Sequence, residues 1–376
     1  MSSMIPFNRP HRTGREAALL AEALGSDHWR GDGPFTRRAT ALLAPAVGGG
    51  RVLLTTSCTH ALEMAALLLE LGPGDEVIVP AFTFVSTAGA FALRGARVVF
   101  ADIDPRTLNL APADVAAKAT ARTRAIVPVH YAGVACDVDA LAAAAPGASV
   151  IEDNAHGLFG AWRGRPLGSL GRLATQSFHD TKNLGCGEGG ALVINDPVLA
   201  ARAEIIREKG TDRSRFFRGE VDKYTWVDVG SSYLPSDLLA AVLTAQLEDA
   251  AAIQAARQRV WARYHTELAG WADRHGVALP HLPTGAEHPA HIYWMRVRDL
   301  GVRTHLLAHL AARDVHATFH YQPLHLSEMG RRLGGQPGDC PVTEAAADTI
   351  VRLPVYVDLT DDQVTRVIDA VMSFTP

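Results

Sequence analysis

Residues 51–82, RVLLTTSCTHALEMAALLLELGPGDEVIVPAF, contain an apolar run, a helical stretch and a second apolar run. The same alternation continues to about residue 200, with further apolar runs at 96–103, 124–133, 148–156, 174–179 and 189–196. Runs that are apolar on nearly every residue and are separated by helices are typical of strands in a parallel sheet covered on both faces. The sequence therefore predicts an α/β fold around a largely parallel sheet.

The rest of the chain has a different pattern. Residues 236–276 form one long helical run, which we expect to bridge two domains. After it come a strand over 291–299, a helix near 303–313, a strand near 315–321 and a last helix after 357–363. The sequence thus predicts a large α/β domain over 1–250 and a small α+β domain over 251–376. Residues 211–233 fit neither period, and their length favours an intersubunit or active-site loop.

Composition excludes several classes of function. The net charge is −4, with both signs mixed along the chain, so no basic surface for nucleic acid is expected. No stretch has the roughly 18 apolar residues of a membrane span, and the first residues lack the apolar core of a secretion signal, so we expect a cytoplasmic protein. The four cysteines form no CxxC pair, and the histidine pairs in 287–291 and 320–325 lack a third ligand. Neither a disulfide framework nor a metal site is predicted.

Lysine is scarce in this chain. Of 36 basic residues only four are lysine, namely Lys118, Lys182, Lys209 and Lys223. Arginine supplies charge but is effectively never deprotonated, so a retained lysine suggests amine chemistry, although ordinary surface use is the alternative. Lys182 lies in SFHDTKNLGCGEGG (177–190), among small, polar and glycine residues, and it is the strongest candidate.

Two further polar groups fall where strands are expected to end. Asp153 follows a strand that ends at Glu152–Asp153, and the hydroxyls of Thr56, Ser57 and Thr59 begin a helix. Ligands in open α/β sheets bind beyond the carboxyl ends of strands, and a helix N-terminus suits a phosphate. Each feature alone also fits ordinary helix capping. A lysine, a carboxylate and a phosphate-binding helix end together match pyridoxal 5′-phosphate (PLP), which needs an imine partner, a group that keeps its pyridine nitrogen protonated, and a phosphate anchor.

Other cofactor and catalytic motifs are missing. The glycines of GCGEGG (185–190) precede a strand rather than a helix, so the dinucleotide-binding context fails. No Walker motif and no GxSxG elbow is present. These absences argue against a nicotinamide-dependent oxidoreductase and a serine hydrolase.

Ordered blocks along nearly the whole chain resemble one known family. The blocks are TSCTHALEMAAL, PAFTFVSTAGA, VHYAG, IEDNAHG, SFHDTKNLGCGEGG, GSSYLPSDLLAAVLTAQL, HYQPLH and LPVY. Their order resembles that of the DegT/DnrJ/EryC1/StrS sugar aminotransferases. Within the family, IPFNRP, GDGPFTRR, EIIREKG and FFRGEVDKYTW are most similar to the transaminases that form dTDP-4-amino-4,6-dideoxygalactose.

The resemblance implies the fold-type I, aspartate aminotransferase-like architecture, with a mainly parallel seven-stranded sheet in the large domain, a small C-terminal domain and a homodimer that shares its active sites. It implies that Lys182 is the Schiff-base lysine and that Asp153 pairs with the pyridine nitrogen. The other positions that match cofactor-binding residues are Cys58, Thr59, Phe84, His156, Ser177 and Ser232. Two of them depart from the pattern, because the family usually has glycine at Cys58 and asparagine at Ser232. Serine is shorter and donates one hydrogen instead of two, so the intersubunit phosphate contact is in question.

The activity that the resemblance implies is a two-stage transamination. L-glutamate leaves its amino group on the cofactor as pyridoxamine phosphate (PMP), and C4 of dTDP-4-keto-6-deoxy-D-glucose then receives it. The residues expected to contact substrate are Arg213, Arg215, Arg218 and Lys223 in the 211–233 loop, together with His320, Tyr321 and His325. The C4 epimer stays open, as does the pathway, which is antibiotic or surface-polysaccharide sugar biosynthesis.

Three alternatives remain within or beside this family. One is amination at C3 of a dTDP-3-keto-6-deoxyhexose. A second is a PLP-dependent sugar 3-dehydratase, which has histidine in place of the imine lysine, so Lys182 argues against it. A third is a non-catalytic cofactor-binding regulator, which the complete set of site residues argues against.

Overall fold

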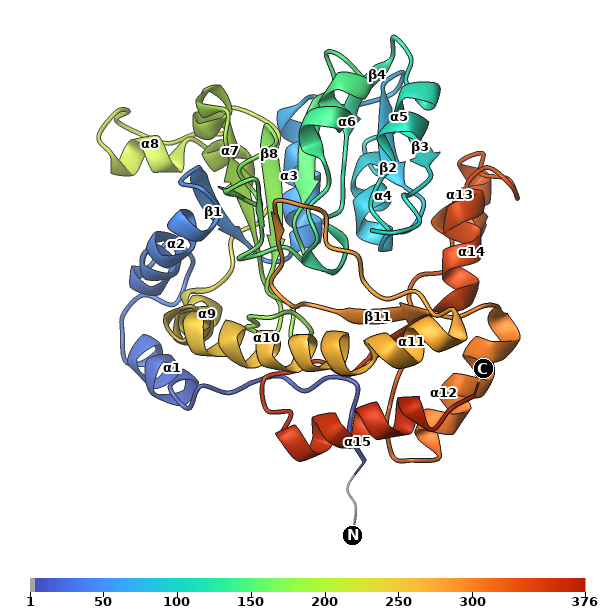
Figure 1. Ribbon diagram of the computed structural model, residues 1–376. Helices are drawn as coiled ribbons and strands as arrows, with labels where there is room; N and C mark the ends of the chain where they lie inside the picture. The colour runs from blue at the N-terminus through green and yellow to red at the C-terminus, as the bar shows by residue number, and fades with distance from the viewer. Residues whose placement is uncertain (1–3, 376) are drawn as a thin grey trace.

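The computed structural model describes residues 4–375. At its centre is a seven-stranded sheet in the order β1-β9-β8-β5-β4-β2-β3 (Figure 1). Its strands are β1 (Arg51–Thr55), β2 (Glu76–Pro80), β3 (Arg97–Ala101), β4 (Thr123–Ile126), β5 (Ser149–Asp153), β8 (Leu173–Ser177) and β9 (Gly190–Ile194). Neighbouring strands are parallel except around β9, which runs antiparallel to both β8 and β1. The predicted α/β fold with a mainly parallel seven-stranded sheet is confirmed.

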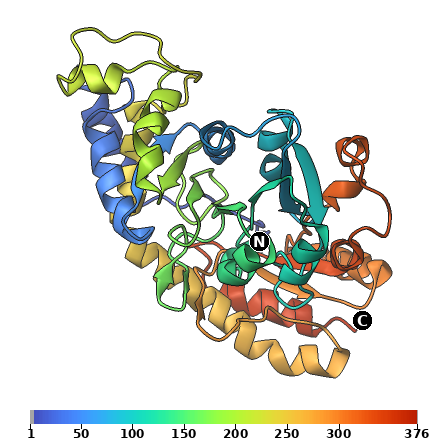
Figure 2. The ribbon, with the colours of Figure 1, turned by 90° about the horizontal axis from the view of Figure 1, so that it is seen from above.

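Helices cover both faces of the sheet because successive side chains of a strand point to opposite faces. In β1, Leu53 packs toward one layer, while Val52 and Leu54 pack toward the other. The first layer contains α3 (Cys58–Leu68), α4 (Val85–Ala92) and α7 (Ala200–Arg207). The second contains α1 (Glu16–Leu24), α2 (Pro34–Ala46) and α9 (Asp237–Glu248), with α5 (Pro112–Lys118) and α6 (Val138–Ala144) over the other half of the sheet. Figure 2 shows the sheet between these layers.

The connections at one edge of the sheet bring the candidate site residues together. The parallel strands β1, β5 and β8 end on the same edge, where α3 begins after β1 and the segment carrying Lys182 links β8 to β9. No helix separates β5 from β8. The link contains β6 (Ala161–Trp162) and β7 (Arg165–Pro166); β6 pairs with β7 on one side and with β10 (Ala286–Glu287) on the other.

The predicted helical run over 236–276 consists of α9, α10 (Ala250–Glu267) and α11 (Ala269–His275). Helix α10 joins two cores, because Ile253 packs with the second helical layer and Val260 packs in the C-terminal core. Within residues 4–375 no single helix is long and apolar enough to cross a membrane. The pair α9 and α10 passes such a test by length and composition, but the two helices are bent by 61°.

The C-terminal core surrounds a two-stranded antiparallel sheet. Strands β11 (Tyr293–Arg296) and β12 (Ile350–Leu353) pack with α10, α11, α12 (Leu300–Ala311) and α15 (Asp361–Met372). Ile5 from the N-terminal segment also belongs to this core, at 0% exposure. Apart from α8, the remaining elements are η1 (Tyr131–Gly133), η2 (Pro197–Leu199), η3 (Leu324–Leu326), α13 (Glu328–Arg332) and α14 (Pro341–Thr349). The division of the chain at residue 250 stays a prediction.

The predicted strand near 315–321 is wrong. Val315 forms a single bridge with Ile5, and Thr318 forms one with Arg352. Because the two residues pair with different segments, no continuous ladder forms between them.

The segment 211–233 projects from the molecule next to α7 (Figures 1 and 2). It contains one short helix, α8 (Arg213–Phe217), and is otherwise irregular, as its sequence pattern indicates. Several large apolar side chains are exposed here, among them Phe217 at 66% and Trp226 at 76%. The described chain does not itself cover this apolar surface.

Candidate active site

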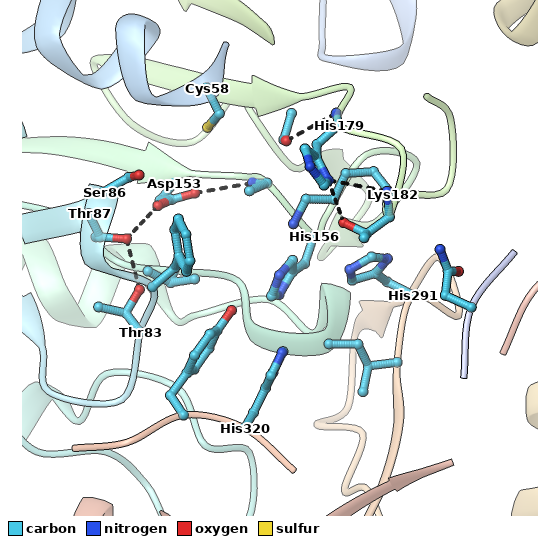
Figure 3. Close-up of a pocket in the computed structure, with 18 of the residues that line it drawn as sticks. Cys58, Thr83, Ser86, Thr87, Asp153, His156, His179, Lys182, His291 and His320 are labelled. Atoms are coloured by element: carbon cyan, nitrogen blue, oxygen red, sulfur yellow. Dashed lines mark hydrogen bonds between the residues drawn. The ribbon is translucent and has the colours of Figure 1, made fainter. Parts of the chain in front are cut away.

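A cavity of about 660 Å³ lies at the carboxyl ends of the parallel strands. Its lining comes from the sheet edge, from the C-terminal core and from the N-terminal residues Phe7 and Asn8. Lys182 and Asp153 both line it. Figure 3 shows Cys58, Asp153, His156 and Lys182 around the same space. A volume between 300 and 1,000 Å³ is typical of small-molecule sites.

Lys182 is held through its backbone, and its amine has no side-chain partner within residues 4–375. Its N–H donates to the carbonyl of His179 at 2.9 Å, in a turn that begins where Phe178 N–H bonds Gly189 at 2.8 Å. Burial lowers the pKa of Lys182, and the positive charge of Arg352 lowers it further, while Cys58 and Asp153 act in the opposite direction. The amine is thus deprotonated more readily than an ordinary lysine, as a base or a nucleophile requires.

Asp153 ends β5 and is 5% exposed. Its carboxylate accepts from the Thr87 hydroxyl at 2.8 Å and from the Ala155 N–H at 3.2 Å. Thr83 and Thr87 are themselves 2.8 Å apart between hydroxyl oxygens. Burial raises the pKa of Asp153, although both hydrogen bonds and the charge of Lys182 oppose the shift. This carboxylate lacks a close cationic partner of its own.

The N-terminus of α3 forms another part of the cavity wall. Ser57 is its N-cap and accepts from the His60 N–H at 3.1 Å, and the N–H groups of the first turn have no acceptor within the helix. Strand β9 approaches this turn closely at Gly190, where a Cβ would lie 2.3 Å from the Ser57 carbonyl carbon. Thr59 contacts Ser86 at 2.8 Å between hydroxyl oxygens. The helix dipole and free amides make this end suitable for a phosphate.

Cys58 and Ser177 lie at this same wall and line the cavity. The Cys58 thiol contacts the Thr175 hydroxyl at 3.4 Å, and burial raises the pKa of this thiol. A neutral thiol adds no negative charge where a phosphate would bind. The departure from glycine at Cys58 is therefore compatible with an anion site.

Three histidines lie side by side in the cavity wall. His156 and His291 have ring centroids 4.5 Å apart, and His156 and His320 are nearly parallel at 6.4 Å. Burial lowers the pKa of all three, and the positive charge of Lys182 contributes. All three are neutral near pH 7. Nδ1 of His156 is buried without a partner in the described chain, so it is free to bond a ligand.

Two aromatic residues from the sequence prediction also line the cavity. Phe84, at the N-cap of α4, is 58% exposed, which is unusual for a large apolar ring and suits a residue that stacks on a ligand. Tyr321 stacks on His320 with centroids 4.0 Å apart. His320 in turn contacts the Tyr131 hydroxyl at 3.2 Å.

Six predicted residues lie outside this cavity: Arg213, Arg215, Arg218, Lys223, Ser232 and His325. His325 is fully buried and bonds Glu344 at 3.1 Å. Arg213 pairs with Glu208 at 2.6 Å in the projecting segment, which also carries the exposed Lys223. Ser232 is exposed and bridges Glu208 through its backbone. Within one protomer the structure brings together Lys182, Cys58, Thr59, Phe84, Asp153, His156, Ser177, His320 and Tyr321.

Sequence reasoning missed several residues of the site. Thr87 follows Phe84 by three residues on the first turn of α4, a signal that was present in TFVSTAGA. The sequence pattern indicates His291 only as a possible metal ligand, whereas its Nδ1 lies 2.7 Å from the side-chain oxygen of Asn183. Arg352 is an arginine inside the apolar strand β12, IVRL, which is itself an unusual pattern.

These residues fit PLP. Asp153 offers a buried carboxylate for a protonated pyridine nitrogen, and His156 offers an unpartnered ring nitrogen beside it. Phe84 offers an exposed ring face, and the start of α3 with Ser177 offers a phosphate site. Lys182 offers an amine of lowered pKa.

Residues 10–372 match the model of the DegT/DnrJ/EryC1/StrS aminotransferase family. The aminotransferase TlmJ from Streptoalloteichus hindustanus is 34% identical, with a TM-score of 0.90 over 99% of this chain and 98% of that one. DesV from S. venezuelae, solved with a ketimine intermediate, is 31% identical, with a TM-score of 0.90 over the full length of both chains. Spr1654 from Streptococcus pneumoniae in its PMP form is 27% identical, with a TM-score of 0.90 and 98% of both chains covered. The chain therefore belongs to the DegT/DnrJ/EryC1/StrS family and is a PLP-dependent sugar aminotransferase.

Proposed function

We propose that this enzyme transfers the amino group of L-glutamate to C4 of dTDP-4-keto-6-deoxy-D-glucose. The product is a dTDP-4-amino-4,6-dideoxyhexose. The observation that carries the proposal is that Lys182, Asp153 and the α3 N-terminus meet in one cavity of a sugar aminotransferase. The choice of C4 rests on a resemblance of sequence blocks to those of C4 transaminases, IPFNRP and FFRGEVDKYTW among them.

Bound PLP supplies a carbonyl that takes up the donor's amine and a ring that accepts electrons from the broken C–H bond. The protein supplies the proton transfers. Nζ of Lys182 takes the proton from Cα of the amino acid in the first half-reaction and delivers a proton to C4 of the sugar in the second. The lowered pKa of Lys182 favours the neutral amine that the first step needs.

The side of the sugar ring that faces Lys182 determines the epimer of the product. His320 and Tyr321 line the cavity on the side of the C-terminal core and can bond sugar hydroxyls there. His320 is neutral, so it can donate or accept according to the hydroxyl that it meets.

We also propose a homodimer in which the segment 211–233 of one protomer completes the site of the other. The exposed Phe217 and Trp226 give this segment an apolar surface of the kind found at protein interfaces. Arg213, Arg215 and Arg218 are already in ion pairs with Glu208, Glu220 and Glu204. Lys223 is exposed and is the better candidate for the substrate's pyrophosphate across the interface.

A product assay tests the proposal. The purified enzyme is incubated with L-glutamate and dTDP-4-keto-6-deoxy-D-glucose, and NMR identifies the carbon that carries nitrogen and its configuration. We expect nitrogen at C4. Nitrogen at C3, or loss of the C3 hydroxyl without incorporation of nitrogen, would contradict the proposal.

A further inference from the structure

The cavity residue His291 lies in a short segment, 288–292, whose backbone is held by side chains. The segment connects β10 to β11, and each of its five carbonyl groups accepts a hydrogen bond from a side chain. The donors are Gln254, Arg257, Gln258 and Trp261 from α10, and Asn183 from the segment that carries Lys182. Ala290 has a φ of 51°, a left-handed conformation that is unfavourable for residues other than glycine. The surrounding donors therefore fix the position of the His291 ring.

Asn183 determines which nitrogen of His291 carries the proton. Its NH₂ group donates to the side-chain oxygen of Gln254 at 3.0 Å and to the carbonyl of Pro289 at 2.8 Å, so both of its hydrogens are used. Its oxygen lies 2.7 Å from Nδ1 of His291 and is therefore the acceptor of a proton on Nδ1. Burial lowers the pKa of His291, so the ring is neutral near pH 7. A neutral ring with its proton on Nδ1 can only accept at Nε2.

Nε2 of His291 is thus a hydrogen-bond acceptor on the cavity wall. His291 lines the cavity, and Nδ1 is its only ring nitrogen with a hydrogen-bond partner within residues 4–375. Figure 3 shows its ring beside that of His156 and on the same side of the cavity as Lys182. His156 is not the donor to Nε2, because the two rings pack face to face, with centroids 4.5 Å apart and 34° between their planes. A ring N–H points along the plane of its own ring and not toward a ring stacked on it.

The Lys182 amine is the protein donor best placed to meet this nitrogen. Lys182 precedes Asn183 in the chain, the side chain of Asn183 contacts the His291 ring, and the four-carbon stem of a lysine is flexible. The positive charge of Lys182 also contributes to the lowered pKa of His291, as expected for two groups that lie close together.

A free lysine amine needs such an acceptor to act as a directed base. A hydrogen bond from Nζ to a fixed acceptor orients the lone pair of Nζ, and the same bond stabilises the ammonium that forms when Nζ takes a proton. A carboxylate in this place would keep the lysine charged. The neutral ring of His291 supports the ammonium without taking the proton itself, because burial lowers the pKa of the ring.

We propose that Nε2 of His291 accepts a hydrogen bond from the Lys182 amine whenever this amine is not bonded to the cofactor. His291 is then a positioning residue for both proton transfers, and Asn183 keeps its tautomer fixed. In the donor half-reaction the proton passes from Cα of the amino acid to Nζ and stays on Nζ, while another N–H of Nζ remains bonded to Nε2. This inference rests on the proposed role of Lys182 as imine partner and base.

The test measures the pKa of Lys182 in the full-length enzyme in its PMP form, where this amine is free of the cofactor. The chain has only four lysines, so lysine labelled with carbon-13 at Cε gives few NMR signals. The signal that is missing in Lys182→Ala belongs to Lys182, and its titration gives the pKa of the amine. The donor half-reaction is followed in parallel, from the change in cofactor absorbance when L-glutamate is added to the PLP form.

Two variants separate the acceptor at Nε2 from the bond to Asn183. His291→Asn keeps an N–H near the position of Nδ1 but lacks the acceptor, whereas His291→Gln places an amide oxygen near the position of Nε2. His288→Asn is the matched control. His288 belongs to the same segment and packs on Trp261, with ring centroids 4.2 Å apart, but it does not line the cavity.

We expect His291→Asn to lower the pKa of Lys182 by about 1 to 2, because the ammonium loses a hydrogen bond. The rate of the donor half-reaction at saturating L-glutamate should fall about 10- to 100-fold, while the half-saturating concentration stays within about twofold. α-Deuterated glutamate should show a larger isotope effect than in the wild type, because proton transfer becomes slower. His291→Gln should recover part of the pKa and part of the rate, and His288→Asn should match the wild type.

Two results would overturn the assignment. If His291→Asn behaves as the wild type and His291→Gln is impaired, the ring serves only to hold Asn183. If the rate falls in His291→Asn but the pKa of Lys182 does not change, His291 acts on the substrate and not on the lysine. Borohydride reduction of the PLP form separates this inference from the proposed function. Cofactor trapped on another lysine would contradict the role of Lys182, whereas cofactor trapped on Lys182, with a pKa independent of His291, would contradict this inference alone.

Discussion

Strand β5 ends in two neighbouring carboxylates that face opposite sides of the sheet, and they differ in the number of hydrogen bonds that they accept. Glu152 is 0% exposed and accepts four hydrogen bonds, from Nε2 of His130 at 2.8 Å and from the N–H groups of Gly168, Leu170 and Gly171 at 2.7–2.9 Å. Asp153 is 5% exposed and accepts two. Burial disfavours the ionised form of both carboxyl groups. The bonds to Glu152 outweigh burial and lower its pKa, whereas burial dominates at Asp153 and raises its pKa.

The comparison shows that the number of donors, rather than burial, separates a structural carboxylate from a functional one here. His130 cannot be a full cation in this geometry, because its Nδ1 accepts the Cys136 N–H at 3.0 Å. It is a neutral donor that completes the Glu152 network. The Glu152 side is closed and holds the loop after β7. The Asp153 side is left incomplete toward the cavity, as the proposed pairing with a cationic ring nitrogen requires.

The largest effect is expected from Lys182→Ala, which removes the amine that faces Asp153 across the cavity. Loss of proton transfer and of the covalent partner together should lower the rate at least about 10⁴-fold. The free energy of unfolding should change by less than about 1 kcal/mol, since the amine has no hydrogen-bond partner within the described residues. On purified protein, the rate is measured by a turnover assay and the free energy of unfolding by urea denaturation.

Borohydride reduction and Lys118→Ala provide the controls for that variant. Lys118 bonds Asp114 at 2.8 Å away from the cavity, so its loss should leave activity intact. A borohydride-reducible chromophore that persists in Lys182→Ala would show that another amine holds the cofactor.

Glu152→Gln tests the hydrogen bonds that enclose the Glu152 carboxylate. An amide replaces one carboxylate oxygen with an NH₂ group, so two of the four donors lose their acceptor, and the expected loss in free energy of unfolding is about 2–5 kcal/mol. Since the folded pKa of Glu152 is below its unfolded value near 4.5, its stabilisation is complete above pH 4.5 and is lost as the pH falls through the folded pKa. The difference from wild type in urea unfolding should therefore be largest near pH 7 and shrink in acid.

Glu70→Gln is the control, because Glu70 forms an exposed pair with Arg202 and should cost less than about 1 kcal/mol. The activity of folded Glu152→Gln should remain within a few-fold of wild type. A large loss of activity without loss of stability would remove the distinction between the two carboxylates.

Asp153→Asn tests the carboxylate that faces the cavity. In contrast to Glu152→Gln, it should lower the activity strongly and should not lower the stability. We expect about a 10²- to 10³-fold lower rate, because the variant cannot hold a pyridine nitrogen in its protonated form. The cofactor-free variant should be as stable as wild type or more so. A raised pKa makes the ionised form unfavourable in the fold, and this cost grows as the pH rises from the unfolded value near 3.8 through the folded pKa. A variant that loses stability at pH 7 would contradict the assignment.

The sequence predicted the surroundings of Asp153 better than those of Glu152. Lys182, Asp153 and the start of α3 follow from residue type, strand order and the resemblance, because parallel strands bring their carboxyl ends to one edge. The alternation of side chains along a strand also predicts that Glu152 and Asp153 face opposite sides of the sheet. The backbone donors to Glu152, however, come from a loop 16 to 19 residues further along the chain, and no local sequence pattern indicates the course of that loop. Arg352 and Phe7 meet from opposite ends of the chain, so only tertiary packing reveals them. His325 is next to its candidate neighbours in sequence, yet it turns into the core toward Glu344.

Thr87→Val should give the smallest effect, because it removes one of the two donors to Asp153 at nearly constant volume. Asp153 would retain only the Ala155 N–H, so its pKa should rise further, and the acidic limb of the kcat/KM profile should move to higher pH. One hydrogen bond to a charged group corresponds to about 1.5–3 kcal/mol, or roughly 10- to 100-fold in rate at the acidic end, with little change on the plateau. Thr87→Ser should restore the wild-type limb, and Thr304→Val, which removes a hydroxyl bonded to Leu300 in α12, should leave it unchanged. If the limb does not move in Thr87→Val, then Asp153 does not depend on its donors, and the contrast with Glu152 must come from the cofactor alone.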